Sequence, residues 1–289
     1  MKLSVVVVSF SAPHLLERTL TALAHQQTPA IELLVVRTGA TPLFQPDFPG
    51  VRWLQGAPVM TVPQLRSLGI QQAQGEIVAL LEDDCLVTGA WCQRIIQAHQ
   101  APHAVIGGAV EPSQYQRGRD WAIYFCDYVR FMQPFMGEVR ALCGNHVSYK
   151  RAILAPLLAK SDGFYEVFVH QELQTQGEIL WAEPGLVVHN INSWSLDHVW
   201  RVPFHHGRGY AGMRVAGRSL AARLPFLGIA LLLPLLQTVR IAQVVLTRRR
   251  YRLRFLQALP WVLSFCSSWA LGECIGYLKG PGRSLEYWR

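Results

Sequence analysis

Hydrophobic and polar positions over the first 82 residues follow two periodicities. Four short runs are almost entirely apolar, the pattern of strands buried on both faces of a parallel sheet: 3–10, 31–37, 51–54 and 76–82. The segments 13–27 and 62–75 instead carry apolar residues at helical spacing. The order strand, helix, strand, strand, helix, strand predicts an open, mostly parallel α/β sheet.

Three carboxylates end the last of these strands. Glu82, Asp83 and Asp84 directly follow the apolar run, and their mutual repulsion at the end of a buried strand is unfavourable. In open α/β sheets the ligand lies beyond the carboxyl ends of the strands, where Ser9 and Phe10 are also expected. Mg²⁺ or Mn²⁺, bound through one or two carboxylates and the oxygens of a diphosphate, would neutralise the charge. Capping of the helix that follows is the alternative, although one cap does not need three carboxylates.

An ordered series of motifs extends over residues 3–215. The motifs are SVVVVSF, RSLGIQQAQGEIVALLEDDC, GGAVEP, LCGNHVSYKRAIL, DGFYE, QEL and EPGLVVHN. Their order resembles that of family 2 glycosyltransferases with the GT-A fold, of the membrane-associated bacterial type. The resemblance implies a Rossmann-like, mostly parallel α/β domain. It also implies transfer of a sugar from a nucleotide diphosphate donor, usually with inversion.

The resemblance implies roles for several residues around the acidic triplet. EDD corresponds to the DXD motif of the family, so Asp84 is expected to bind the metal directly. Glu82 and Asp83 are expected to face the donor ribose or the metal. Arg66 matches an arginine that lies near the donor. His189 matches a histidine that completes the metal or diphosphate site, with ordinary core packing as its alternative.

Three further positions concern the nucleobase of the donor. Ser9 and Phe10 match the family positions that meet the base. Arg37 stands at the end of the second strand, where the family usually has an acidic residue that reads the base. A guanidinium can instead donate hydrogen bonds to a carbonyl edge or to phosphate. The identity of the base therefore stays open.

The segment YEVFVHQEL departs from the family pattern Glu-Asp-any-Glu-Leu. His170 falls on the usual catalytic Asp and Val169 on the Glu before it. The acceptor hydroxyl must lose its proton as it attacks the anomeric carbon, and a histidine accepts a proton near neutral pH. His170 is therefore the expected base and Glu172 the alternative; both reach one site only if the segment is not helical. A solvated helix start without chemistry is the third interpretation.

Charge is divided unevenly along the chain. Residues 1–200 contain 13 Lys/Arg and 17 Asp/Glu, whereas residues 201–289 contain 14 and 2. The basic residues of the tail alternate with long apolar runs rather than with exposed aromatics, which favours an anionic membrane surface over nucleic acid. The expected domains are a nucleotide-sugar glycosyltransferase domain at 1–215 and a basic, apolar, membrane-associated helical region at 216–289.

Two apolar runs in the tail, 224–239 and 255–278, leave its relation to the membrane open. The first has 16 residues, short of the roughly 20 that cross a bilayer unless it continues to residue 246. Two crossings would put the arginines of 248–254 on the opposite side of the membrane from the donor site. The positive-inside rule favours the cytoplasm for these arginines, and the donor site is expected there as well. Interfacial or re-entrant helices resolve this conflict; true spans and a soluble helical subdomain are the alternatives.

Together these patterns predict an inverting, metal-dependent glycosyltransferase of the hexosyltransferase class at the cytoplasmic face of the cell membrane. The expected partners are a nucleotide diphosphate sugar, a carbohydrate or lipid-linked acceptor of polysaccharide or glycolipid assembly, and membrane lipids, with Mg²⁺ or Mn²⁺ as cofactor. Six cysteines without a CxxC pair agree with a reducing compartment. The alternative is a catalytically silent nucleotide-sugar-binding membrane scaffold, favoured by the unusual Val169-His170 pair and by Arg37.

Overall fold

A computed structural model of the chain describes residues 2–10, 12–26, 28–38, 48–113, 115–159, 161–191 and 194–287. Contacts group the chain into two compact units. The sheet unit comprises Met1–Ser113 and Phe131–Asn192, and the helical unit comprises Gln114–Arg130 and Ser193–Arg289. The domain boundary expected at residue 215 stays a prediction.

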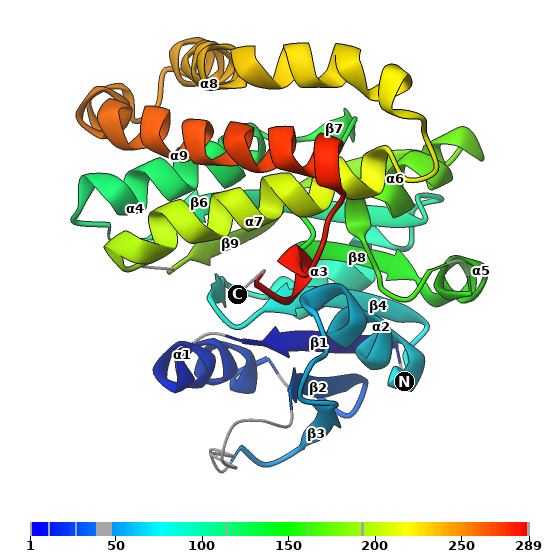
Figure 1. The fold of residues 1–289 in the computed structure, drawn as a ribbon. Coiled ribbons are helices and arrows are strands. Elements are labelled where there is room, and N and C mark those ends of the chain that lie inside the picture. The colour runs from blue at the N-terminus through cyan, green and yellow to red at the C-terminus, as the bar shows by residue number, and fades with distance from the viewer. Residues whose placement is uncertain are drawn as a thin grey trace. The chain divides into compact units, whose positions relative to one another are not determined.

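The described part of the sheet unit contains nine strands in one mixed sheet of order β3-β2-β1-β4-β8-β6-β9-β5, with β7 paired to β9 (Figure 1). The strands are β1 (Leu3–Ser9), β2 (Ile31–Thr38), β3 (Val51–Gly56), β4 (Ile77–Glu82), β5 (Cys85–Val87), β6 (Val105–Pro112), β7 (Gly137–Val139), β8 (His146–Lys150) and β9 (Leu180–Asn190). The first four strands run parallel, and β8 is antiparallel to β4 and β6. The predicted α/β sheet is confirmed.

The helices of the sheet unit follow the helical spacing of the sequence. They are α1 (Pro13–Ala24), α2 (Val62–Gln72), α3 (Trp91–Ala98), α5 (Leu154–Leu158) and α6 (Glu166–Thr175). The start of α2 is marked by the backbone N–H of Thr61, which donates to Oε1 of Gln64 at 2.9 Å. Gln27, the last residue of the first expected helix, lies outside the described residues. The first strand, β1, is completely buried from Val5 to Val8; β2 and β4 pair with its two edges, and α2 packs against it.

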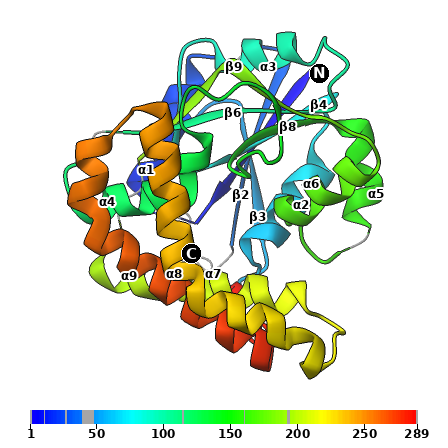
Figure 2. The ribbon, with the colours of Figure 1, turned by 90° about the horizontal axis from the view of Figure 1, so that it is seen from above.

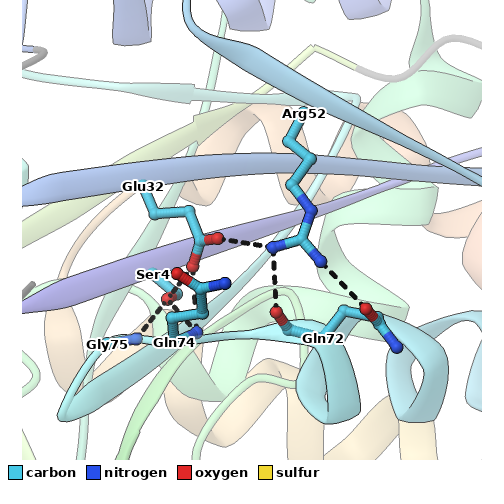
Figure 3. A network of polar contacts seen from close by, with 6 residues as sticks. All are labelled: Ser4, Glu32, Arg52, Gln72, Gln74 and Gly75. Carbon is cyan, nitrogen blue, oxygen red and sulfur yellow. Dashed lines mark hydrogen bonds and ion pairs between the residues drawn. The ribbon is translucent and has the colours of Figure 1, made fainter.

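A polar network joins the amino-terminal ends of three parallel strands, at the edge opposite the expected site (Figure 3). Glu32 accepts hydrogen bonds from Ser4 Oγ at 2.5 Å, from Arg52 Nη1 at 2.8 Å and from the backbone N–H of Gln74 at 3.0 Å. The N–H of Gly75 also donates to Ser4 Oγ. The backbone N–H groups of Gln74 and Gly75 therefore donate to side chains rather than to helix carbonyls. The helix α2 ends at Gln72, three residues before Gly75, where the sequence pattern placed its end.

The helical unit is built on three long helices. They are α7 (Leu196–Arg214), α8 (Leu220–Arg248) and α9 (Arg252–Lys279), accompanied by the short helices α4 (Gly118–Ile123), η1 (Tyr124–Tyr128) and η4 (Ser284–Tyr287). Figure 1 and Figure 2 both show α9 alongside α7 and α8, which it contacts. A serine precedes α7 and α8: Ser195 accepts from the N–H of His198, and Ser219 from that of Ala222. The two apolar runs of the tail therefore lie in two separate helices.

We predict that His99, buried in the sheet unit with Nε2 2.8 Å from Ser148 Oγ, makes folding sensitive to acid. Burial lowers the pKa of His99 to about 4, so the unfolded chain binds more protons between pH 4 and 6.5. This contribution to stability is complete above pH 6.5 and is lost as the pH falls towards 4. Because one pKa unit corresponds to about 1.4 kcal/mol, His99→Gln should flatten the decline in unfolding free energy by on the order of 3 kcal/mol. Urea denaturation across this range tests it; parallel curves for both proteins would contradict it.

Candidate active site

The carboxyl ends of three parallel strands meet at one edge of the sheet. In the strand register Ser9 of β1 pairs with Arg37 of β2, and Val8 pairs with Glu82 of β4. The backbone N–H of Phe10 donates to Oδ2 of Asp83 at 3.1 Å. The structure thus brings the residues expected around the donor base next to the acidic triplet.

The charge of the triplet is balanced first by an arginine. Arg66 of α2 donates from Nη2 to Glu82 Oε1 at 2.6 Å and from Nη1 to Glu166 Oε2 at 2.5 Å. Burial would lower the pKa of Arg66, but the carboxylates of Glu166 and Glu82 outweigh it and raise that pKa above its ordinary value. A buried, permanently charged guanidinium therefore bridges two carboxylates that come from different elements.

The two carboxylates that share Arg66 differ in pKa. Burial raises the pKa of Glu82, although Arg66 and a hydrogen bond from Asn145 act against it. Burial also acts to raise the pKa of Glu166, but there Arg66 prevails and the pKa lies below its ordinary value. Glu166 is therefore the carboxylate that stays ionised most readily.

Asp84 has a different environment from Glu82. Its side chain accepts from Asn190 Nδ2 at 2.9 Å and from the thiol of Cys85 at 3.2 Å, and the residue is 1% exposed. Burial raises the pKa of Asp84 to about 7, and the nearby charges of Glu82 and Asp83 add to the shift. Among the described residues no arginine or lysine is paired with Asp84.

A divalent cation fits this environment. It would give Asp84 a positively charged partner, and a hard cation prefers oxygen ligands such as a carboxylate. Within the described ranges no three His, Cys, Asp or Glu side chains are placed to hold a metal ion together. A cation bound through one or two carboxylates and the oxygens of a diphosphate does not need such a set.

The structure brings Asn190 rather than His189 to Asp84. Neighbouring residues of a strand point to opposite faces, and His189 pairs in register with Leu86 of β5. Its Nδ1 lies 3.4 Å from the carbonyl oxygen of Pro112, and the residue lines an open pocket of about 580 Å³ beside α1. Asn190 follows the histidine in the motif VVHN, so strand alternation was the signal for it. The metal or diphosphate role of His189 stays a prediction.

His170 and Glu172 occupy different sides of α6. The segment is helical from Glu166 onward, and two residues along a helix are separated by about 200°. His170 is 3% exposed, with Nε2 2.8 Å from the hydroxyl of Tyr149. Glu172 is partly exposed and accepts from Gln176 Nε2 at 3.1 Å. The structure therefore does not bring the two candidate bases into one site, and His170 is not part of a solvated helix start.

Glu166 is a site residue that the sequence analysis did not select. It lies one helical turn before His170, and its side chain occupies the space beside Gly144: a Cβ on Gly144 would lie 2.5 Å from Glu166 Cδ. The charge of His170 contributes to the lowered pKa of Glu166, so the two groups interact electrostatically. The position of Glu166 at the end of DGFYE, four residues before the histidine, was the available signal.

Arg37 lies against an aromatic ring at the edge of the sheet. Its guanidinium carbon is 5.2 Å from the ring centroid of Trp53 on β3. Desolvation lowers the pKa of Arg37. An arginine side chain nevertheless stays charged near neutral pH. A guanidinium over an indole ring combines hydrogen-bond donors with an aromatic surface at one place.

Comparisons with known proteins relate the chain to a sequence family and to solved structures. Residues 4–158 match the family model described as Glycosyl transferase family 2. The mannosyltransferase PcManGT from Pyrobaculum calidifontis in complex with GDP-Man and Mn²⁺ is structurally similar, with a TM-score of 0.57, 16% identity, and coverage of 96% of this chain and 87% of that chain. GalNAc-T7 with UDP, GalNAc and Mn²⁺ has a TM-score of 0.53 and 14% identity, over 66% of this chain and 44% of that chain. No curated protein sequence matches the chain significantly.

We predict that the Arg66 bridge dominates the stability of this edge. Arg66→Gln leaves Glu82 and the partly exposed Glu166 without their cation, and removing one partner of a buried ion pair typically costs about 3–5 kcal/mol. The matched control is Arg52→Gln, which breaks the ion pair with Glu32; the Arg52 side chain is 37% exposed, so the expected cost is below about 1 kcal/mol. Urea denaturation of both variants provides the comparison. Equal losses of unfolding free energy in the two variants would contradict the prediction that the Arg66 bridge contributes more than the Arg52 ion pair.

Proposed function

This chain belongs to glycosyl transferase family 2, and we propose that it transfers a hexosyl group, with inversion, from a nucleotide diphosphate sugar to a membrane-proximal acceptor. It has the GT-A fold of its structural neighbours. The observation that carries the proposal is the cluster at the ends of the parallel strands, where Asp84 lies beside the bridge formed by Glu82, Arg66 and Glu166.

The proposed metal is Mg²⁺ or Mn²⁺ at Asp84. Mn²⁺ accompanies the nucleotide or nucleotide sugar in both neighbouring structures, which supports a divalent cation here. When bound, such a cation would neutralise charge on the diphosphate leaving group. Asp84 would hold it, Asn190 and Cys85 orient the carboxylate, and His189 is kept as a proposed further ligand.

His170 is the proposed general base. Deprotonation of the acceptor hydroxyl puts a proton on the imidazole, and the ionised Glu166 one turn earlier stabilises the resulting cation. Tyr149 orients the ring through its hydroxyl. Glu166 is the second candidate for the base, since its side chain is 25% exposed, but its lowered pKa makes it a weaker proton acceptor.

The donor nucleotide is proposed to lie along the edge formed by β1, β2 and β4. Ser9 and Phe10 would contact the base, with Arg37 and Trp53 offering hydrogen-bond donors and an aromatic face beside them. Glu82 and Asp83 would face the ribose or the metal. In this arrangement Arg66 would bridge the carboxylates of Glu82 and Glu166 and contribute positive charge near the diphosphate.

The proposed acceptor and cellular location are supported by the composition of the tail. Among the described residues, α8 and α9 are long and apolar enough to cross a membrane, which weakly supports membrane association. A catalytic domain held at the cytoplasmic face of the cell membrane would suit a lipid-linked or other acceptor of polysaccharide or glycolipid assembly. A screen of purified protein against nucleotide sugars, reading released nucleotide diphosphate, tests the activity. Tight binding without turnover would instead support the silent scaffold.

We predict that Asp84→Ala abolishes metal-dependent transfer while the protein stays folded. The substitution removes a carboxylate that is repelled by Glu82 and Asp83, so the thermal midpoint should not fall by much. Transfer at increasing Mn²⁺ and a thermal melt are measured together. Asp84→Asn, which keeps the shape of the side chain, separates loss of charge from loss of packing. Wild-type rates in both variants would exclude Asp84 as the metal ligand.

A further prediction concerns the base. Since general-base catalysis contributes about 10²- to 10⁴-fold, His170→Ala should lower transfer by that order with little change in donor affinity. His170→Asp should recover part of the rate, and the acid limb of its pH–rate profile should move down towards the range of a carboxylate. Gln171→Ala, on the exposed side of α6, is the neighbouring control. Normal turnover in His170→Ala together with a dead Glu166→Gln or Glu172→Gln would move the base to that carboxylate.

A further inference from the structure

The solvent-facing side of α8 is apolar over most of its length. Ala230, Leu233, Ile241 and Val245 are buried and mark one face of the helix. Large apolar side chains between 37% and 71% exposed occupy the rest: Leu220, Leu224, Ile229, Leu231, Leu232, Leu235, Leu236, Val239 and Leu246. Between Arg223 and Arg240 the helix carries no charged residue. An apolar surface of this length is unfavourable in water and implies a covering partner.

On α9 the exposed apolar residues form a narrower row. Leu253, Leu256, Leu263, Leu271 and Leu278 are between 41% and 67% exposed, at intervals of three, seven or eight residues that keep them on one face. The other sides of α9 contact α4, α7 and α8. We define the leucine face as these five residues of α9 together with the nine exposed apolar residues of α8.

The packing of α9 against α7 argues against a hairpin that crosses the bilayer. A Cβ on Gly272 would lie 2.1 Å from the carbonyl oxygen of Phe204, and one on Gly276 would lie 2.5 Å from that of Arg208, so the two helices touch at the backbone. Since α7 carries arginines and histidines along its length, a crossing α9 would take these polar side chains into the hydrocarbon layer. One side of the α8–α9 hairpin is thus packed against the polar helix α7.

Arginines concentrate where α8 meets α9. The turn is made by Arg249 and Tyr251, which have φ of 56° and 54°. The sequence RRRYRLR places five arginines over residues 248–254, and Arg240 is exposed about two turns before them. Crossing the bilayer would require this cluster to pass through the membrane, whereas an orientation in the membrane plane leaves it at the headgroups.

We infer that the α8–α9 hairpin lies in the plane of the membrane interface, with its leucine face in the acyl layer and its arginines on anionic headgroups, rather than spanning the bilayer. This deepens, and rests on, the proposed membrane location. A second copy of the chain is the less favourable occupant, because pairing two leucine faces would bring two arginine clusters together, whereas anionic lipid complements them.

Flotation of the full chain with phosphatidylcholine vesicles, with or without phosphatidylglycerol, tests the two kinds of contact. Leu231→Gln with Leu235→Gln should weaken partitioning into both vesicle types by about tenfold or more, since buried apolar area drives it. Arg240→Gln with Arg249→Asn should weaken binding to the anionic vesicles by about fivefold per arginine and leave neutral vesicles unaffected. Leu196→Gln, an exposed leucine at the start of α7, is the matched control. Loss of self-association in the leucine variant without loss of vesicle binding would overturn the inference in favour of a dimer.

Trypsin digestion decides between lying on the membrane and spanning it. In inside-out membrane vesicles of an expressing bacterium, an in-plane hairpin is cleaved at 248–254 from outside, and in intact spheroplasts it is protected. The opposite pattern would overturn the inference. Release of nucleotide diphosphate from the donor, measured in detergent on the same proteins, separates the two proposals. Release without vesicle binding rejects only the membrane inference, and binding without release rejects only the glycosyltransferase activity.

Discussion

The pairing of Arg66 with Glu82 and Glu166 is the interaction on which the candidate active site depends. Parallel strands deliver carboxylates to one edge of the sheet, and without a buried cation their repulsion would oppose folding at that edge. The guanidinium has two donor edges, so one side chain fastens the end of β4 to the start of α6. The helix that carries His170 is positioned by the same contact.

Environment separates the carboxylates of this edge into different roles. Glu166 is kept ionised by Arg66, whereas Asp84 is buried with neutral hydrogen-bond partners and has a pKa raised to about 7. A carboxylate that is half protonated near neutral pH is a group for which a divalent cation competes with a proton. The positive charge of Arg66 therefore stabilises the structure of the site, and Asp84 is the carboxylate whose environment fits a bound divalent cation.

The helical unit packs an apolar helix against a polar one and leaves a second apolar helix largely exposed. Its glycines let α9 approach the polar helix α7 at backbone distance, while α8 covers another side of α9 and keeps its own leucines exposed. Hydropathy by itself does not distinguish such a hairpin from two spans, because length and composition are the same in both. The direction in which each apolar side chain faces is what distinguishes an in-plane hairpin from two membrane spans.

The strands and helices and the acidic triplet were available from the sequence, because each depends on residues within a few positions of one another. The family was available from the order of short motifs along residues 3–215. The pattern also placed Ser9, Arg37 and Glu82 at a common edge, since parallel strands end together. Only the tertiary structure paired Arg66 with Glu166 across 100 residues and Asp84 with Asn190 across 106. It also showed that the segment of His170 and Glu172 is helical, which puts the two side chains on different sides of α6. The two long-range pairs depend on how distant segments pack, and a local pattern can point to a candidate residue but not to its partner.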